Sequence, residues 1–224
     1  MTTRKSPSKR RGRPAGSTGT RTREKIINAT REVYSQKGIH GTTVELILEA
    51  ANISRPTFYK YFSSAREAVE AVVEGCNREV EELFSGVFRI PMDSVTSYLP
   101  LLLVSYLNWG RSQGKLMETR FRELHDLSSP VGILRTAHNE RVIGIVSNFL
   151  IADGRPRPSL VSLRAVVNCI EYMAHLFCTT ATQEEMPEYV QAMSRVCIAL
   201  LGNEADWRLL MVEPTPSDAT EVKT

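Results

Sequence analysis

Apolar residues recur every three or four positions along most of this chain, which is the period of an amphipathic α-helix. In the first third, the pattern predicts helices over residues 22–37, 43–51, 55–62 and 65–84. Gly38 follows the first of these, at a position where a left-handed residue commonly ends a helix. The sequence shows no alternating strand pattern and no internal repeat. This part of the chain is therefore predicted to form a compact group of short helices followed by a longer one.

From about residue 91 the predicted helices become more apolar. Four of them cover residues 97–112, 116–127, 159–182 and 187–201. Between the second and the third, a long helix begins at Ser129-Pro130 and stays apolar as far as Phe149. Pro and Gly cluster in residues 153–158, which predicts a break. We therefore expect an all-α protein with an arm (1–20), a head (21–64), a linking helix (65–90), a body (91–204) and a tail (205–224).

Residues 43–62 carry the signals of a helix-turn-helix. Asn52 ends the first short helix, and asparagine tolerates the left-handed backbone that a tight turn requires. Ser54 is predicted to cap the second helix, and Pro56 lies in its first turn, where a missing N–H does no harm. Ile53 is predicted to be a buried anchor between the helices. Such a pair is built to place the start of its second helix in a DNA major groove.

The same stretch resembles the TetR family of bacterial transcriptional repressors. The resemblance is carried by Ile26-Ile27-x-Ala29-Thr30-x-x-Val33-Tyr34-x-x-x-Gly38, then Thr43-Val44-x-x-Ile47, then Ala51-Asn52-Ile53-Ser54-Arg55-Pro56-Thr57-Phe58-Tyr59-Lys60-Tyr61-Phe62. The family usually has Gly, Ala and Lys where this chain has Asn52, Leu48 and Ala65, and Ala65 lacks the phosphate contact that a Lys makes there. Residues 53–59 are most similar to the ethionamide-resistance regulator subgroup.

The resemblance implies a DNA-binding head and a helical-bundle body that binds a ligand and dimerises. It implies a transcriptional repressor that a small hydrophobic ligand releases from a palindromic operator in double-stranded DNA. In such homodimers the last two long helices, here within residues 159–201, pair into a four-helix bundle. These two helices carry a stripe of apolar residues at helical spacing, which is also the pattern of an intramolecular core. Its members are Leu160, Leu163, Val167, Ile170, Ala174, Phe177, Ala181, Tyr189, Ala192, Met193, Val196 and Leu200.

Several side chains are candidates for DNA contact. Arg55 stands at the start of the second helix, and a guanidinium reads guanine through O6 and N7. Thr57 suits a phosphate or a thymine methyl group, whereas Tyr59 and Lys60 suit phosphates. Thr43 either caps its helix only or also presents its hydroxyl to a phosphate. The full set is Arg11, Arg13, Thr43, Arg55, Pro56, Thr57, Tyr59, Lys60 and Tyr61.

Charge is distributed unevenly along the chain. Residues 1–25 hold nine Lys or Arg against one acid, a net charge of +8, which leaves 19 basic and 24 acidic residues, or −5, for the rest. The basic segment attracts phosphate. Within it, Lys9-Arg10-Arg11-Gly12-Arg13-Pro14 looks like the core of an AT-hook, in which Arg11 and Arg13 enter a narrow minor groove. The alternative is a disordered tail whose charges only raise solubility.

A ligand site in the body is expected to be apolar with a few polar residues. Glu171 and His175 lie at i, i+4, so they are a conceivable metal pair, but a hydrogen bond along the helix is the simpler interpretation without a third ligand. Each candidate has the alternative of a satisfied core or surface position. The candidates are Tyr98, Trp109, Phe121, Arg122, His125, His138, Asn139, Asn168, Glu171, Tyr172 and His175.

Other classes of protein find no support in the sequence. It has no nucleophile elbow, P-loop or dinucleotide fingerprint, so we expect neither an enzyme nor a cofactor. No run of 18 apolar residues and no signal peptide is present. The four cysteines lack CxxC spacing, as is typical of thiols in a reducing cytosol, and we expect a cytoplasmic protein. Two alternatives stay open: an architectural DNA-coating protein, and a regulator that senses no ligand.

Overall fold

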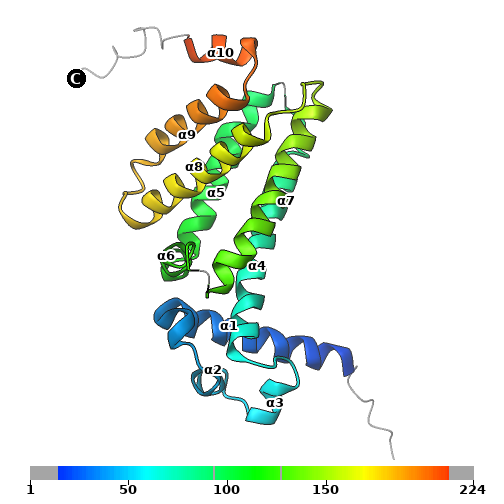
Figure 1. Ribbon diagram of the computed structural model, residues 1–224, viewed down its shortest axis with the longest axis vertical. Coiled ribbons are helices and arrows are strands. Elements are labelled where there is room, and N and C mark those ends of the chain that lie inside the picture. Colours follow the sequence, from blue (N-terminus) through cyan, green and yellow to red (C-terminus); the bar gives the residue numbers. More distant parts are fainter. Residues whose placement is uncertain (1–14, 93, 127, 212–224) are drawn as a thin grey trace, which may run out of the picture. The chain divides into compact units, whose positions relative to one another are not determined.

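All regular secondary structure is helical in the residues that the computed structural model describes, which are 15–92, 94–126 and 128–211. The all-α prediction is therefore confirmed. Figure 1 shows the helices in chain order: α1 (Ala15–Gly41), α2 (Val44–Ala51), α3 (Arg55–Tyr59), α4 (Ala65–Val87), the 3₁₀ turn η1 (Val95–Ser97), α5 (Tyr98–Ser112), α6 (Lys115–Arg122), α7 (Pro130–Ala152), α8 (Leu160–Thr179), α9 (Met186–Leu201) and α10 (Glu204–Met211).

The chain forms two compact units, which we call the head (Met1–Val72) and the body (Val73–Thr224). The division falls inside α4, so this one helix belongs to the head in its first turns and to the body in the rest. The sequence pattern had placed a linking helix over the same region, as residues 65–90.

The head is built around a small apolar core. Ile26 from α1, Ile47 from α2, Phe58 from α3 and Ala68 from α4 are all fully buried in it, together with Phe62. Gly38 interrupts α1 with a φ of 68°, so the predicted end of the helix at residue 37 is confirmed, although the element continues as a further turn to Gly41. The start differs, because helix begins at residue 15 and takes in part of the expected arm.

A capping arrangement starts α4 directly after the helix-turn-helix. The Ser64 hydroxyl accepts a hydrogen bond from the Glu67 N–H at 3.1 Å, and the Glu67 carboxylate accepts from the Ser63 N–H at 2.6 Å. These bonds satisfy backbone donors that a helix start otherwise leaves unpaired. Hydrogen bonds from the Ser63 hydroxyl and from the Ser63 N–H hold the pKa of Glu67 below its ordinary value. The path of the chain out of the helix-turn-helix is thereby fixed.

The body packs α5, α8 and α9 against one another, with α7 against α8 (Figure 1). Its large core includes Leu103 and Leu107 of α5, Phe177 of α8 and Met193 of α9. The Ser129 cap of α7 is confirmed, since its hydroxyl accepts from the Val131 N–H at 3.2 Å. Two helices end earlier than predicted. The helix expected over 116–127 stops at residue 122, and that over 159–182 stops at residue 179, without a hydrogen bond from the Ser159 side chain.

A helix was missed at the end of the body. The sequence analysis assigned residues 205–224 to a tail, yet α10 covers Glu204–Met211. Asp206 of α10 accepts hydrogen bonds from both terminal nitrogens of Arg155, which lies in the loop between α7 and α8. Gly154 precedes this arginine with a φ of 79°, which confirms the predicted break at 153–158. The ion pair is nearly buried, with side-chain exposures of 11% for Arg155 and 6% for Asp206.

Candidate functional site

The head contains a helix-turn-helix formed by α2, a three-residue turn and α3. Thr43 caps α2, since its hydroxyl accepts a hydrogen bond from the Leu46 N–H at 3.3 Å. Asn52 has a φ of 45° and a ψ of 59°, the left-handed conformation predicted for it. The turn closes with a hydrogen bond from the Ile53 N–H to the Leu48 carbonyl at 3.2 Å. The predicted order of helix, turn and helix is confirmed.

The second helix differs from the prediction at both ends. Ser54 has the extended backbone of a capping residue, but its hydroxyl is hydrogen-bonded to the Thr57 hydroxyl at 2.8 Å and makes no cap bond to the backbone. The helix ends at Tyr59 rather than Phe62. Pro56 fixes the first turn, as expected. The result is one and a half turns of helix that depend on side-chain packing for their position.

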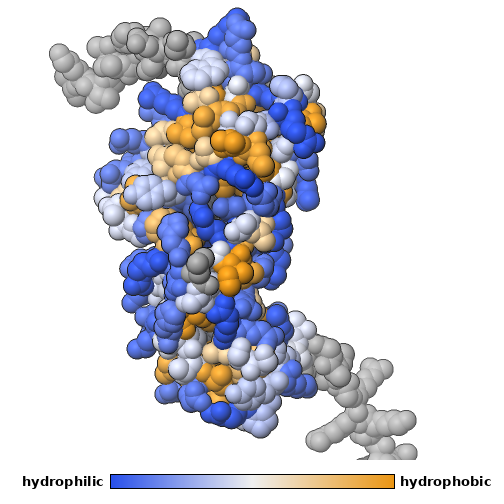
Figure 2. All heavy atoms as spheres, viewed as in Figure 1, coloured by the Kyte–Doolittle hydropathy of each residue, from blue (hydrophilic) through white to orange (hydrophobic). Residues whose placement is uncertain are grey.

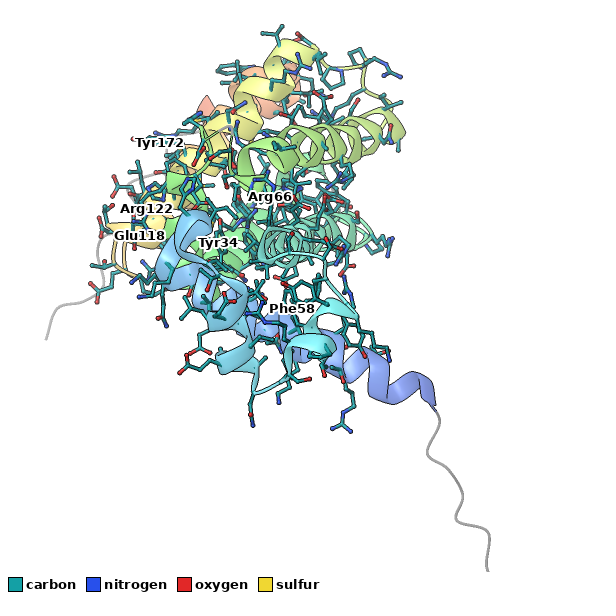
Figure 3. All side chains as sticks on the ribbon, turned by 60° about the horizontal axis from the view of Figure 1, so that its bottom comes forward. Tyr34, Phe58, Arg66, Glu118, Arg122 and Tyr172 are labelled. Atoms are coloured by element: carbon teal, nitrogen blue, oxygen red, sulfur yellow. The ribbon has the colours of Figure 1, made fainter. Side chains whose placement is uncertain are left out.

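That packing comes from two aromatic rings. Phe58 is fully buried beneath α3 (Figure 3), and its ring centroid lies 5.9 Å from that of Phe62. The Arg23 guanidinium of α1 covers the Phe62 ring at 5.2 Å. Both phenylalanines are core residues, as predicted. They leave the opposite side of α3 free to face outward.

The exposed side of α3 presents most of the predicted DNA-contacting residues. Arg55, Pro56 and Lys60 are exposed, and Tyr59 is 47% exposed. Thr43 is exposed at the start of α2, whereas Thr57 is half-buried. Tyr61 is half-buried and packs against the head core, so it is less accessible to DNA than its neighbours. Arg11 and Arg13 lie outside the described residues.

An ion pair joins the two helices of the motif. The Arg55 guanidinium donates a hydrogen bond to the Glu45 carboxylate of α2, and both side chains are more than half exposed. Hydrogen bonds from the Glu45 backbone and from Arg55 lower the pKa of Glu45 below 4.5. This partner was missed by the sequence analysis, because a separation of ten residues across a turn has no characteristic spacing. The predicted base-reading side chain therefore already holds a carboxylate.

The body contains a large cavity, with about 1020 Å³ of space between its lining atoms, part of which opens to solvent. Aliphatic and aromatic side chains from α4, α5, α7, α8 and α9 form most of its wall. The Phe88 and Phe149 rings stack there with their centroids 4.1 Å apart. The polar and charged side chains in the wall are Thr96, Tyr98, Tyr106, His138, Asn139, Arg155, Glu171 and Asp206.

Most of these polar groups are already paired within the protein. The Tyr98 hydroxyl donates to the Ile90 carbonyl at 2.7 Å. Glu171 accepts from Arg135 of α7 at 2.7 Å. His138 donates from Nδ1 to the Glu81 carboxylate at 2.8 Å, and burial lowers the pKa of this histidine below 6.5 despite that bond. Its imidazole is consequently neutral near neutral pH.

A smaller cavity, with about 410 Å³ of space, shares part of its wall with the large one. Val80, Tyr106, His138 and Glu171 line both cavities. Trp109, Met117, Arg120, Phe121 and Leu124 complete the wall of the smaller cavity. Trp109 donates from its indole N–H to Glu79 at 2.8 Å.

The structure separates the predicted ligand-contacting residues into two sets. Tyr98, His138, Asn139 and Glu171 line the large cavity, and Trp109 and Phe121 line the smaller one. The remaining five line neither of these two cavities: Arg122, His125, Asn168, Tyr172 and His175. Arg122 and Tyr172 are exposed at the outside of the body (Figure 3). Sequence reasoning missed Arg155 and Asp206, because an ion pair between a loop and a later helix has no local signal.

Glu171 and His175 do not act as a pair. Glu171 is bound by Arg135, while the His175 ring stacks on Phe121 with centroids 3.6 Å apart. Among the described residues, no group of three His, Cys, Asp or Glu side chains is placed to hold a metal ion. The four cysteines are all free thiols, and burial raises the pKa of Cys178 to about 11 and that of Cys197 to about 12.

Part of the apolar stripe proposed for the dimer is internal. Leu163, Ile170, Ala174 and Phe177 of α8 are buried within the body, so they are core residues rather than an available interface. The outward face of α8 instead carries Val161, which is 77% exposed, and Tyr172, which is 53% exposed. Figure 2 shows hydrophobic surface where Figure 1 draws α8 and α9. By length and composition alone α8 is also apolar enough to cross a membrane, while Leu163, Val166, Ile170, Ala174 and Phe177 on it are buried within the body.

Residues 26–72, which contain the helix-turn-helix and the start of α4, match the family model described as bacterial regulatory proteins, tetR family. This part of the chain is thus a TetR-family helix-turn-helix segment. The family is one of regulatory proteins. Among curated relatives of the chain, the HTH-type transcriptional regulator UidR of Escherichia coli (strain K12) is 30% identical over 74 residues, which are 33% of this chain and 36% of UidR.

A second relative is the HTH-type transcriptional activator FasR of Mycolicibacterium smegmatis, 35% identical over 65 residues, or 29% of this chain and 28% of FasR. The chain thus matches about a third or less of the length of these two relatives. Its fold is similar over a longer span to that of GusR from Salmonella enterica. That likeness has a TM-score of 0.64 at 19% identity and covers 82% of this chain and 96% of GusR.

Proposed function

We propose that this TetR-family protein is a sequence-specific DNA-binding transcriptional regulator that acts as a repressor and is released from a palindromic operator by a small hydrophobic ligand. The observation that supports DNA binding best is the arrangement of α3. Phe58 fixes this short helix on the head core, while Arg55, Tyr59 and Lys60 stay exposed on its outer side. A recognition helix needs this combination of rigid support and free polar side chains.

Each exposed residue suits a different part of DNA. Arg55 suits the edge of a guanine, provided that it exchanges the Glu45 carboxylate for the base. Lys60 and Tyr59 suit phosphates on either side of the groove. Thr43 already caps α2, and its exposed hydroxyl is placed beside a helix start that favours an anion. Pro56, Thr57 and Tyr61 hold the short helix in shape more than they offer free polar groups.

A palindromic operator requires a two-fold symmetric dimer. The outward face of α8 supports such an interface within residues 159–201. Val161, Ala165 and Tyr172 are exposed at helical spacing along one face. Leu200 of α9 adds further apolar surface, at 43% exposure. A self-complementary apolar face of this kind is the feature expected of a homodimer contact.

The large cavity supports release by a ligand. Its wall is mainly apolar, and Val80 and Phe84 of α4 form part of it. The same α4 begins at Ala65, directly after the helix-turn-helix, and runs without interruption to Val87. A ligand that favours one position of α4 at Phe84 therefore also favours one position of the start of that helix. It shifts DNA binding only by its difference in affinity for the two states.

The direction of the output is part of the proposal. FasR is named an activator, so activation is the second candidate for this chain. An architectural DNA-coating role is the third, and it lacks a use for the cavity. The protein is expected to act in the cytoplasm, where bacterial DNA is accessible.

Selection of bound fragments from random DNA, followed by variants of α3, tests the proposal. Arg55→Ala is expected to cost about 1–3 kcal/mol at one position of each half-site and to change the ranking of single-base operator variants. Lys60→Ala is expected to weaken binding to all sequences equally and to reduce the salt dependence. Arg208→Ala, at an exposed position of α10, is the control and is expected to change neither. Binding without any sequence preference would show the architectural alternative to be right.

A further inference from the structure

The smaller cavity of the body contains an arginine whose charge is not balanced locally. Arg120 of α6 lines it, and the hydrogen bond that its guanidinium makes goes to the neutral amide oxygen of Asn77, at 2.8 Å. Among the described residues, no carboxylate oxygen lies within 4.0 Å of Arg120, although many of the body's other arginines have such a partner. An unpaired guanidinium in a partly buried site attracts an anion.

Two hydrogen-bond donors beside this charge are also unsatisfied. The Nε of Arg120 and the Nδ2 of Asn77 are buried and have no hydrogen-bond partner among the described residues. Asn77 as a whole is only 1% exposed. Buried donors are paired in nearly all folded proteins, so these two unpaired donors favour an acceptor beside Arg120, which lines the smaller cavity although Asn77 does not. A carboxylate, which has two oxygens and only accepts, fits donors of this kind.

The charged side chains of the large cavity, unlike Arg120, have partners of opposite charge. Its charged lining residues are paired: Arg155 with Asp206, and Glu171 with Arg135. Its histidine donates to Glu81. A charged group of a ligand would find no free partner there, whereas a hydrocarbon chain would be well accommodated by the apolar wall. Because Tyr106 and Val80 belong to the walls of both cavities, the two cavities are adjacent, and a molecule that occupies both passes these side chains.

We infer that the effector of this regulator is an amphipathic carboxylic acid, whose carboxylate binds the Arg120 guanidinium and whose hydrocarbon chain occupies the large cavity. This inference rests on the proposed effector role of the cavity and adds the chemical class of the ligand. Glu171 also lines the smaller cavity, but its carboxylate is held by Arg135, which limits its repulsion of a second anion. Arg120 is then the residue that distinguishes acids from alcohols and amines.

Calorimetric titration of the full chain with octanoate, 1-octanol and octylamine tests this inference. Octanoate is expected to bind about tenfold or more tightly than the other two, because a hydrogen bond to a charged group contributes about 1.5–3 kcal/mol. Lengthening the chain to decanoate is expected to tighten binding about fourfold for each added methylene that is buried. Arg120→Met is expected to abolish the preference for the acid while leaving 1-octanol binding unchanged.

Arg122→Met is the matched control, because Arg122 lies on the same helix, is exposed and lines neither cavity. It is expected to bind all three compounds as the wild type does. Arg120→Lys keeps the charge and is expected to retain a weaker preference for octanoate, which covers the case in which Arg120→Met does not fold. Equal binding of 1-octanol and octanoate by the wild type overturns the inference, as does a failure to bind either octanoate or decanoate.

A separate measurement tests the proposed release from DNA. If octanoate binds through Arg120 but leaves the affinity for the selected operator unchanged, the ligand assignment stands and release by the ligand is wrong. Operator binding is therefore measured with and without octanoate, for the wild type and for Arg120→Met.

Discussion

Removal of the Asp206 carboxylate is expected to destabilise the body by about 3 kcal/mol. This carboxylate accepts two hydrogen bonds from Arg155 and one from the Asn203 N–H at 2.8 Å. Breaking a buried ion pair by truncating one partner costs about 3–5 kcal/mol, since the other charge is left behind. The Asp153 carboxylate still accepts from Arg155 at 3.0 Å in the variant, which places Asp206→Ala at the low end of this range.

Thermal and urea unfolding of the full chain measure the effect. For a protein of this size about 1 kcal/mol corresponds to roughly 2–4 °C in Tm, so Asp206→Ala is expected to lower Tm by about 6–12 °C. Glu204→Ala is the matched control on the same helix, because Glu204 pairs with Arg208 where both side chains are more than three-quarters exposed. Its effect is expected to stay below about 0.5 kcal/mol. Equal Tm values for the two variants would refute the reasoning.

The same pair makes a pH-dependent contribution of known sign. Burial alone would raise the pKa of Asp206, but hydrogen bonds from Arg155 and from the Asn203 backbone outweigh it and leave the pKa below the ordinary 3.8. A group with a lowered folded-state pKa stabilises the protein above its unfolded pKa. The difference between wild type and Asp206→Ala is therefore complete at neutral pH and shrinks as the pH falls below 3.8. A difference that grows on acidification contradicts this assignment.

Two further predictions concern the dimer and the arm. Val161→Asp is expected to shift the protein toward monomer in sedimentation analysis. Ile133→Asp, at an exposed site on α7, is the control and is expected to leave the protein dimeric. An unchanged dimer in the Val161→Asp variant argues against the α8 face as the interface. Deleting residues 1–14 removes six basic residues and leaves α1 intact. The deletion is expected to weaken operator binding most when the operator is flanked by A·T-rich DNA. An equal loss of affinity with G·C-rich flanks would show that these residues contribute only a general attraction for phosphate.

Much of the fold follows from local sequence signals. Helical spacing of apolar residues located the helices, and single residues such as Gly38, Asn52 and Ser129 located their ends, because their backbone or capping preferences act over a few residues. The same approach missed α10, which lies beyond the break at Gly202 and is fixed by Asp206 contacting a loop about 50 residues earlier in the chain. A tertiary contact of this length has no periodic signature.

The candidate sites also include residues that local sequence signals predict and residues that they do not. The exposed positions of α3 were predictable because Phe58 and Phe62 alternate with them at helical spacing. The ligand site was harder, since any polar residue in an apolar helix fits the pattern equally well. Asn139 faces the large cavity, whereas Asn168 is bound by Arg135 outside it. Which of two similar asparagines faces a cavity depends on the rotation of packed helices, and that is a property of the assembled body.

The Glu45–Arg55 ion pair has a consequence for how a DNA-reading protein searches for its site. If Arg55 reads a guanine as proposed, it must give up the Glu45 carboxylate to do so. On unrelated DNA the guanidinium would keep that partner and would add little to the general attraction for phosphate. Recognition would then be an exchange of one partner for another, which favours fast release from wrong sequences.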